Sequence, residues 1–110
     1  MNTSQINKNN LLNTIDGYGF VVGLPEGRQC YLLGSLSAIT ALLAVLKDAR
    51  NPTLTPLSAQ AASTLAAINA REKINGTEAE RRNPGRFQEL TDTARSELSK
   101  MRQAVLKQSF

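Results

Sequence analysis

The 110-residue sequence contains no histidine, no tryptophan and only one cysteine. Histidine is the most common general base and a frequent metal ligand, so its absence removes the usual centre of acid–base catalysis and of metal sites. A single cysteine, Cys30, cannot form a disulfide within the chain. Aromatic residues account for only 5% of the sequence. The core must therefore be built from aliphatic side chains, which favours helices packed on one another over an aromatic-rich sandwich.

The side chains that could act in catalysis or metal binding also do not occur in the combinations that these functions need. Cys30 has no histidine to activate it and has apolar neighbours, so we interpret it as a small buried hydrophobic residue. The acidic pairs Glu78 with Glu80 and Glu89 with Asp92 are interleaved with arginines, which is typical of a solvated helix surface. The glycines near the N-terminus lack the spacing of a phosphate-binding loop. The sequence therefore predicts a non-enzymatic protein with no catalytic residue, no metal site and no cofactor.

Charge is missing altogether from the segment Gln29–Leu46. A helix that is apolar on all sides must be buried in protein or in lipid. Its strongly apolar part, Leu36–Leu46, has only eleven residues, whereas a membrane-spanning helix needs about 20. We therefore predict no membrane span and a buried central helix at about residues 36–49, which Asn51-Pro52 would end.

Two further helices are expected in what we predict to be a single small domain covering residues 1–110. Thr55-Pro56 is typical of a helix start, and Asn75-Gly76 of a helix end, so the second helix should span about 56–75. The third should span about 85–107. The predicted fold class is mainly α, a small bundle of three helices.

A short N-terminal β-hairpin is expected beside this bundle. Asp16-Gly17 indicates a turn, and two short runs rich in aromatic and β-branched residues then flank a loop with two glycines and a proline, which predicts a hairpin at about residues 18–33. Asparagine is a poor helix former. The asparagine-rich residues 1–10 are therefore either a disordered tail or part of a short helix near residues 5–14.

The last predicted helix has the most regular amphipathic pattern, with apolar side chains at steps of three and four residues. Because three helices in so short a chain leave apolar surface uncovered, we expect this stripe to contact a second copy of the chain or a partner helix. The candidate interface residues are Phe87, Leu90, Leu98, Met101 and Val105.

Basic residues gather in the C-terminal part of a chain whose net charge is +4 and whose isoelectric point is about 9.6. Residues 71–110 carry nine basic and six acidic side chains. A basic segment that precedes a helix is suited to phosphate contacts, so nucleic-acid binding is an alternative. Its candidate contact residues are Arg71, Lys73, Arg81, Arg82 and Arg86. Interleaved glutamates and the lack of interleaved aromatic side chains argue against it.

The polar N-terminus has no basic segment that leads into an apolar one, so it does not match a secretory signal, and we expect a cytoplasmic protein. The favoured hypothesis is a helical protein-interaction module, an adaptor, inhibitor or small regulator, which acts as a homo-oligomer. Its partner would be another protein or a second copy. The alternative is a small nucleic-acid-binding regulator that uses residues 71–86.

Overall fold

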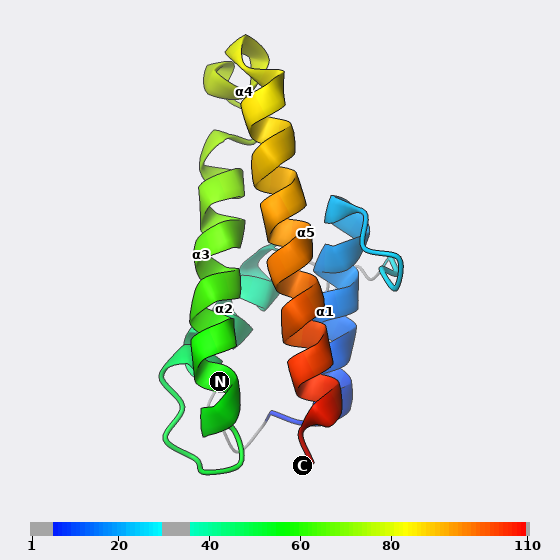
Figure 1. Cartoon of the computed structure of the whole chain (residues 1–110), viewed down its shortest axis with the longest axis vertical. Coiled ribbons are helices and arrows are strands. Elements are labelled where there is room, and N and C mark those ends of the chain that lie inside the picture. Colours follow the sequence, from blue (N-terminus) through cyan, green and yellow to red (C-terminus); the bar gives the residue numbers. More distant parts are fainter. Residues whose placement is uncertain (1–5, 30–35, 110) are drawn as a thin grey trace.

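A computed structural model of the chain describes residues 6–29 and 36–109. Throughout these residues the regular structure is helical, which confirms the mainly α class (Figure 1). The elements in chain order are α1 (Lys8–Val22), α2 (Leu36–Lys47), the 3-10 helix η2 (Thr55–Leu57), α3 (Ser58–Ile74), α4 (Glu78–Arg82) and α5 (Pro84–Lys107).

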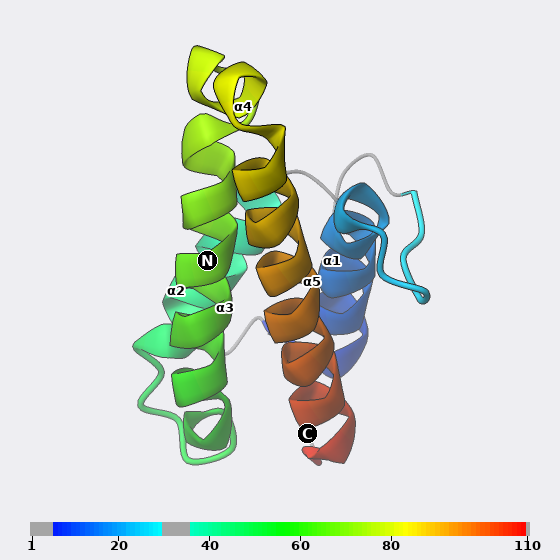
Figure 2. The ribbon, with the colours of Figure 1, turned by 45° about the horizontal axis from the view of Figure 1, so that its top comes forward.

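Helices α3 and α5 form an antiparallel hairpin that the short helix α4 closes at one end (Figure 1). Helix α1 packs along α5, and α2 packs on α3 and α1 (Figure 2). The molecule measures 44 × 24 × 23 Å. The bundle therefore contains α1 as a further long helix beside the three that the sequence predicts.

The predicted β-hairpin at about residues 18–33 is wrong, because residues 18–22 belong to α1 and no strand occurs in the described part of the chain. The second predicted strand falls partly on residues 30–33, which lie outside the described residues. Helix α1 begins after Asn7, whose side-chain oxygen accepts the backbone N–H of Asn10 at 2.8 Å, and it ends at Gly23, whose φ is 84°. Its large buried apolar side chains recur at helical spacing: Leu11, Ile15, Tyr18 and Val22. Tertiary burial at this spacing outweighs the local β preference of the segment.

Helix α2 is a core helix, as its lack of charge predicts, although it ends at Lys47 rather than near residue 49. Leu43 and Leu46 are fully buried, whereas Leu36, which we expected in the core, is 40% exposed at the start of the helix. The predicted start of the next helix at residue 56 is a 3-10 turn, which leads into α3 at Ser58.

Helix α5 lies between α1 and α3 and matches its predicted span within one residue at its start. Its buried side chains follow the predicted stripe and comprise Ala94, Leu98, Met101 and Val105. A bundle of three helices would leave this stripe exposed. Helix α1 covers it, so the stripe packs inside the chain.

Cations connect the ends of the antiparallel helices α1 and α5. The Nζ of Lys8 donates to the carbonyl oxygens of Leu106 and Gln108, at 3.2 and 3.1 Å, at the end of α5. The Nε of Arg95 donates to the carbonyl oxygen of Val22, at 2.8 Å, at the end of α1. Both cations satisfy carbonyl groups that lack a partner within their own helix and complement the helix dipole.

A buried carboxylate near the middle of α1 joins the same two helices. Asp16, in α1, accepts hydrogen bonds from the Nε and Nη2 of Arg102 at 2.8 and 3.5 Å. Arg28, in the loop after α1, approaches the same carboxylate at 3.6 Å and donates to Asn13 at 2.9 Å. The hydrogen bond to Asp16 raises the pKa of Arg102. The Asp16-Gly17 pair therefore lies inside a helix and helps to hold α1 on α5.

Candidate partner-binding site

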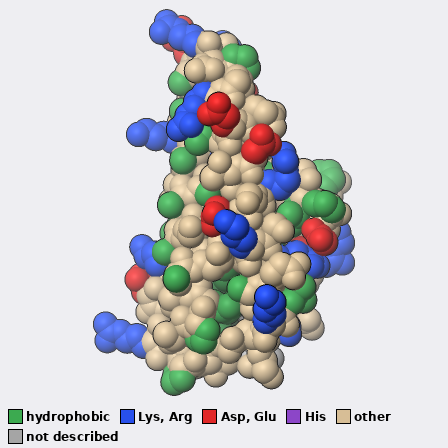
Figure 3. Space-filling view, viewed as in Figure 1, with side chains coloured by type: hydrophobic (Ala, Val, Ile, Leu, Met, Phe, Trp, Pro, Cys, Tyr) green, Lys and Arg blue, Asp and Glu red, His purple; other side chains and the backbone are tan. Residues whose placement is uncertain are grey.

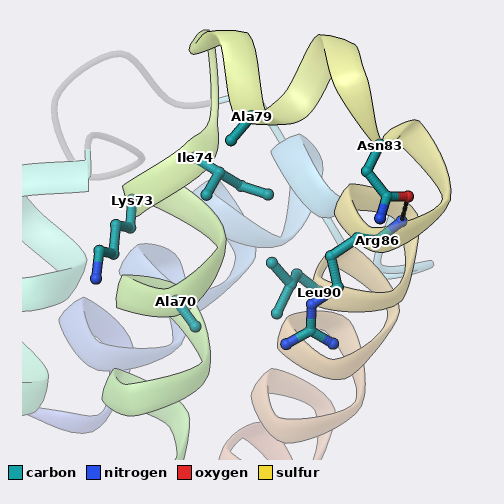
Figure 4. A pocket seen from close by; sticks show the side chains of 7 residues that line it. All are labelled: Ala70, Lys73, Ile74, Ala79, Asn83, Arg86 and Leu90. Carbon is teal, nitrogen blue, oxygen red and sulfur yellow. Dashed lines mark hydrogen bonds between the residues drawn. The ribbon is translucent and has the colours of Figure 1, made fainter.

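Two local features of the sequence, a glycine after α3 and an asparagine before α5, shape the end of the α3–α5 hairpin. Gly76 has a φ of 76°, which allows the chain to leave α3. Glu80 of α4 accepts the backbone N–H of Gly76 at 2.7 Å. Asn83 then caps α5, because its side-chain oxygen accepts the backbone N–H of Arg86 at 3.0 Å (Figure 4). These bonds hold α4 across the space between α3 and α5.

A groove of about 470 Å³ opens under α4, between the last turns of α3 and the first turns of α5. Figure 4 shows Ile74 and Leu90 on opposite walls, with Ala70 below and Ala79 above. Lys73, Asn83 and Arg86 complete the lining. The walls are thus apolar, and the charged lining residues are both basic.

The basic residues around this groove differ in how their charges are compensated. Arg82 pairs with Glu78 at 2.9 Å, and Arg86 with Glu89 at 3.3 Å, in exposed ion pairs. Lys73 and Arg81 are exposed as well, and within the described part of the chain no carboxylate lies at ion-pair distance from either. Basic side chains project at this end of the molecule in Figure 3.

Arg71 is buried behind the groove and is held by several partners. Its Nε donates to Thr91 Oγ1 at 2.9 Å, its Nη1 pairs with Glu72, and its guanidinium lies 4.7 Å from the centre of the Phe87 ring. The hydroxyl of Tyr18 donates to the same Glu72 carboxylate at 2.8 Å. This polar cluster joins α1, α3 and α5 and fixes the spacing of the groove's two long helices.

The cluster shifts the pKa of two of its members in opposite directions. Burial, with the hydrogen bond to Glu72 and its negative charge, raises the pKa of Tyr18 above its usual value of about 10. Partial burial raises the pKa of Glu72, but hydrogen bonds from Asn75, Tyr18 and Arg71 outweigh it, and the net pKa is lowered. At neutral pH the phenol is therefore protonated and the carboxylate ionised.

The five residues predicted as a partner interface divide into two groups. Leu98, Met101 and Val105 are fully buried against the chain's own helices. Phe87 and Leu90 are half-buried at the α4 end, and Leu90 lines the groove. The predicted contact with a partner stays a prediction, and in this structure only the Phe87–Leu90 end of the stripe reaches the surface.

The five residues predicted to contact nucleic acid are likewise divided. Arg71 is 7% exposed and occupied within the polar cluster. Lys73, Arg81, Arg82 and Arg86 are exposed at the α4 end of the hairpin. The structure thus brings four of the five together on one surface, and their contact with a ligand also stays a prediction.

Sequence reasoning misses Ala70, Ile74 and Ala79, which supply most of the apolar wall of the groove. Ala70 and Ile74 lie four residues apart, so helical spacing alone places them on one face of α3. This face remains open because of the angle at which α4 closes the hairpin. The spacing of residues in the sequence does not predict that angle.

Comparison with known proteins adds no assignment: the chain matches no protein-family model, no curated protein and no solved structure. Within the described residues, no group of three or more cysteine or acidic side chains is arranged to hold a metal ion. Nor does any helix described in the structure have the length and hydropathy to cross a bilayer.

Proposed function

We propose that this chain is a non-enzymatic protein-interaction module that receives its partner in the groove between α3, α4 and α5. The observation that carries the proposal is a concave surface with apolar walls, Ala70, Ile74, Ala79 and Leu90, at the closed end of the hairpin. Pockets of about 300–1,000 Å³ with apolar walls and a few polar groups are typical binding sites. The buried cluster around Arg71 supports this role, because it holds the two helical walls in place before a partner arrives.

Site-specific photo-crosslinking in the native host tests this proposal. Benzoylphenylalanine is introduced at Ala79, which lines the groove, and in a control chain at Gln103, which is exposed on α5 outside it. We expect a nuclease-resistant crosslinked protein from Ala79 and none of that size from Gln103. A product of twice the chain's mass would identify a second copy as the partner. Absence of any product specific to Ala79 would contradict the proposal.

Nucleic-acid binding is the second candidate, because Lys73 and Arg81 are exposed near the groove without a carboxylate partner among the described residues. Exposed basic groups of this kind attract phosphate. A crosslinked product that disappears on nuclease treatment would favour this candidate over a protein partner.

A further inference from the structure

The chemistry of the groove narrows the class of partner, an inference that rests on the proposed function. We propose that the docking segment is an acidic amphipathic helix, which places apolar side chains between Ile74 and Leu90 and carboxylates beside Lys73 and Arg86. The supporting features are the shape of the groove, the charge of its lining and the apolar character of its walls.

The shape of the groove suits a helix. It lies between two antiparallel helices, and an amphipathic helix binds such a groove through apolar side chains spaced three and four residues apart. Ile74 and Leu90 face each other across the gap, and both are half-buried, so each retains apolar surface for an entering side chain (Figure 4). Ala79 above the gap and Ala70 below it have short side chains, which leave room between them.

The basic residues that line the groove favour a partner with negative charge. No acidic side chain lines the groove, whereas Lys73 and Arg86 both do. In the described structure Lys73 has no carboxylate at ion-pair distance. The contact of Arg86 with Glu89 at 3.3 Å is an exposed pair, with which a partner carboxylate can compete at little cost. A helix that carries glutamate or aspartate beside its apolar stripe therefore gains contacts that a basic helix lacks.

The same lining disfavours a nucleic acid as the occupant. Single strands bind through aromatic side chains on which bases stack, and none of the residues that line this groove is aromatic. The nearby Phe87 has one face covered by the guanidinium of Arg71.

Two synthetic helical peptides test this inference. Each has about 15 residues, which is long enough to form a marginal helix in water. Both carry the same leucines at helical spacing, with glutamate at the polar positions of one and lysine at those of the other. Binding to the full chain is followed by fluorescence anisotropy. We expect the acidic peptide to bind about tenfold more tightly, a difference of about 1.4 kcal/mol, which two exposed ion pairs within their usual range of strength can supply.

Three variants locate the binding site. Ala70→Glu places a carboxylate in the groove, and Lys73→Glu reverses a rim charge; each should weaken the acidic peptide, and Lys73→Glu should strengthen the basic one. Gln103→Glu adds the same charge at an exposed position of α5 outside the groove and should change little. All three sites are exposed, so circular dichroism should show unchanged helicity.

Each other outcome overturns the inference. Equal or tighter binding of the basic peptide would contradict the proposed negative charge of the partner. An effect of Gln103→Glu equal to that of Ala70→Glu would place the binding site outside the groove. A short DNA duplex could instead displace the acidic peptide. If Ala70→Glu does not weaken the binding of that duplex, the basic surface would be assigned to phosphate groups rather than to an acidic helix. If neither peptide binds, the acidic helix is excluded, while the crosslinking at Ala79 decides the proposed function separately.

Discussion

Tyr18 shows how one hydroxyl can connect three helices. It extends from α1 to Glu72 of α3, which also pairs with Arg71, and Arg71 in turn contacts Thr91 of α5. A buried donor is costly when it loses its partner, and a hydrogen bond to a charged group is stronger than one between neutral groups. The arrangement therefore depends on a protonated phenol beside an ionised carboxylate.

Tyr18→Phe should destabilise the chain by about 1–3 kcal/mol at pH 7, because the ring remains but the hydrogen bond to the Glu72 carboxylate is lost. The pKa of Tyr18 is raised in the folded state. Its stabilising effect is therefore complete below the unfolded pKa of about 10 and is lost as the pH rises above it. Urea unfolding at pH 7 and pH 11 should show the difference between wild type and variant shrinking by about 1.4 kcal/mol.

Lysine deprotonation also changes stability at pH 11, but it occurs in both proteins and cancels in the comparison. A difference that stays constant between pH 7 and pH 11 would show that the Tyr18 phenol ionises as readily in the folded chain as in the unfolded one, and a difference that widens would show that it ionises more readily in the folded chain.

At the scale of elements, the loop after α1 is held against the helix by unusually close backbone packing. Gly27 lies over Gly19 and Phe20, where a Cβ atom would come within 2.5 Å of the Phe20 backbone nitrogen. Next to it, the backbone N–H of Arg28 donates to the carbonyl oxygen of Asp16 at 2.9 Å. Leu24, in the same loop, is buried. Only glycine allows this approach at position 27.

Gly27→Ala should therefore destabilise the chain by about 1–3 kcal/mol, the usual cost of forcing extra atoms into a packed contact. Gly85→Ala is the matched control, because an added Cβ there meets only the Asn83 side-chain oxygen at 3.6 Å. In the first turn of α5 that change should stabilise by about 0.5–1 kcal/mol. Thermal and chemical unfolding measure both, and an equal effect of the two substitutions would contradict the packing argument.

How far the sequence predicts these elements depends on where the decisive signal lies. Helix α5 is predicted almost residue for residue, because the periodic stripe that identifies it is a local feature of the sequence. Helix α1 is missed because Tyr18 and Val22 both favour strands locally, and only packing against α5 shows that their four-residue spacing decides the structure.

The same error affects the candidate site. With α1 taken as a hairpin, Leu98 and Met101 lack a partner within the chain and become interface candidates; with α1 as a helix they are core residues. The groove cannot be foreseen for a related reason. Its walls come from residues as distant as Ala70 and Leu90, and its opening depends on the angle between their helices.

At the scale of the whole molecule, one long segment of a surface helix carries no charge. From Ser58 to Ala70 helix α3 has no charged residue. Ala59, Ala66 and Asn69 are exposed there. Short side chains allow the axis of a second helix to come close. This face therefore replaces the buried stripe of α5 as the surface through which two copies of the chain would meet.

We predict that the chain forms at least a dimer at micromolar concentration through this face of α3. In a two-fold symmetric contact one substitution acts on both sides of the interface, so Ala66→Glu would bring two unpaired carboxylates into it and should restore the monomer. Gln103→Glu adds the same charge on the exposed side of α5 and should leave the dimer intact.

Sedimentation equilibrium of the three proteins measures the association. A wild-type chain that sediments as a monomer throughout this range would contradict the homo-oligomer predicted from the sequence and leave the groove as the proposed binding surface. An equal loss of association in both variants would instead attribute the dimer to general charge effects rather than to α3.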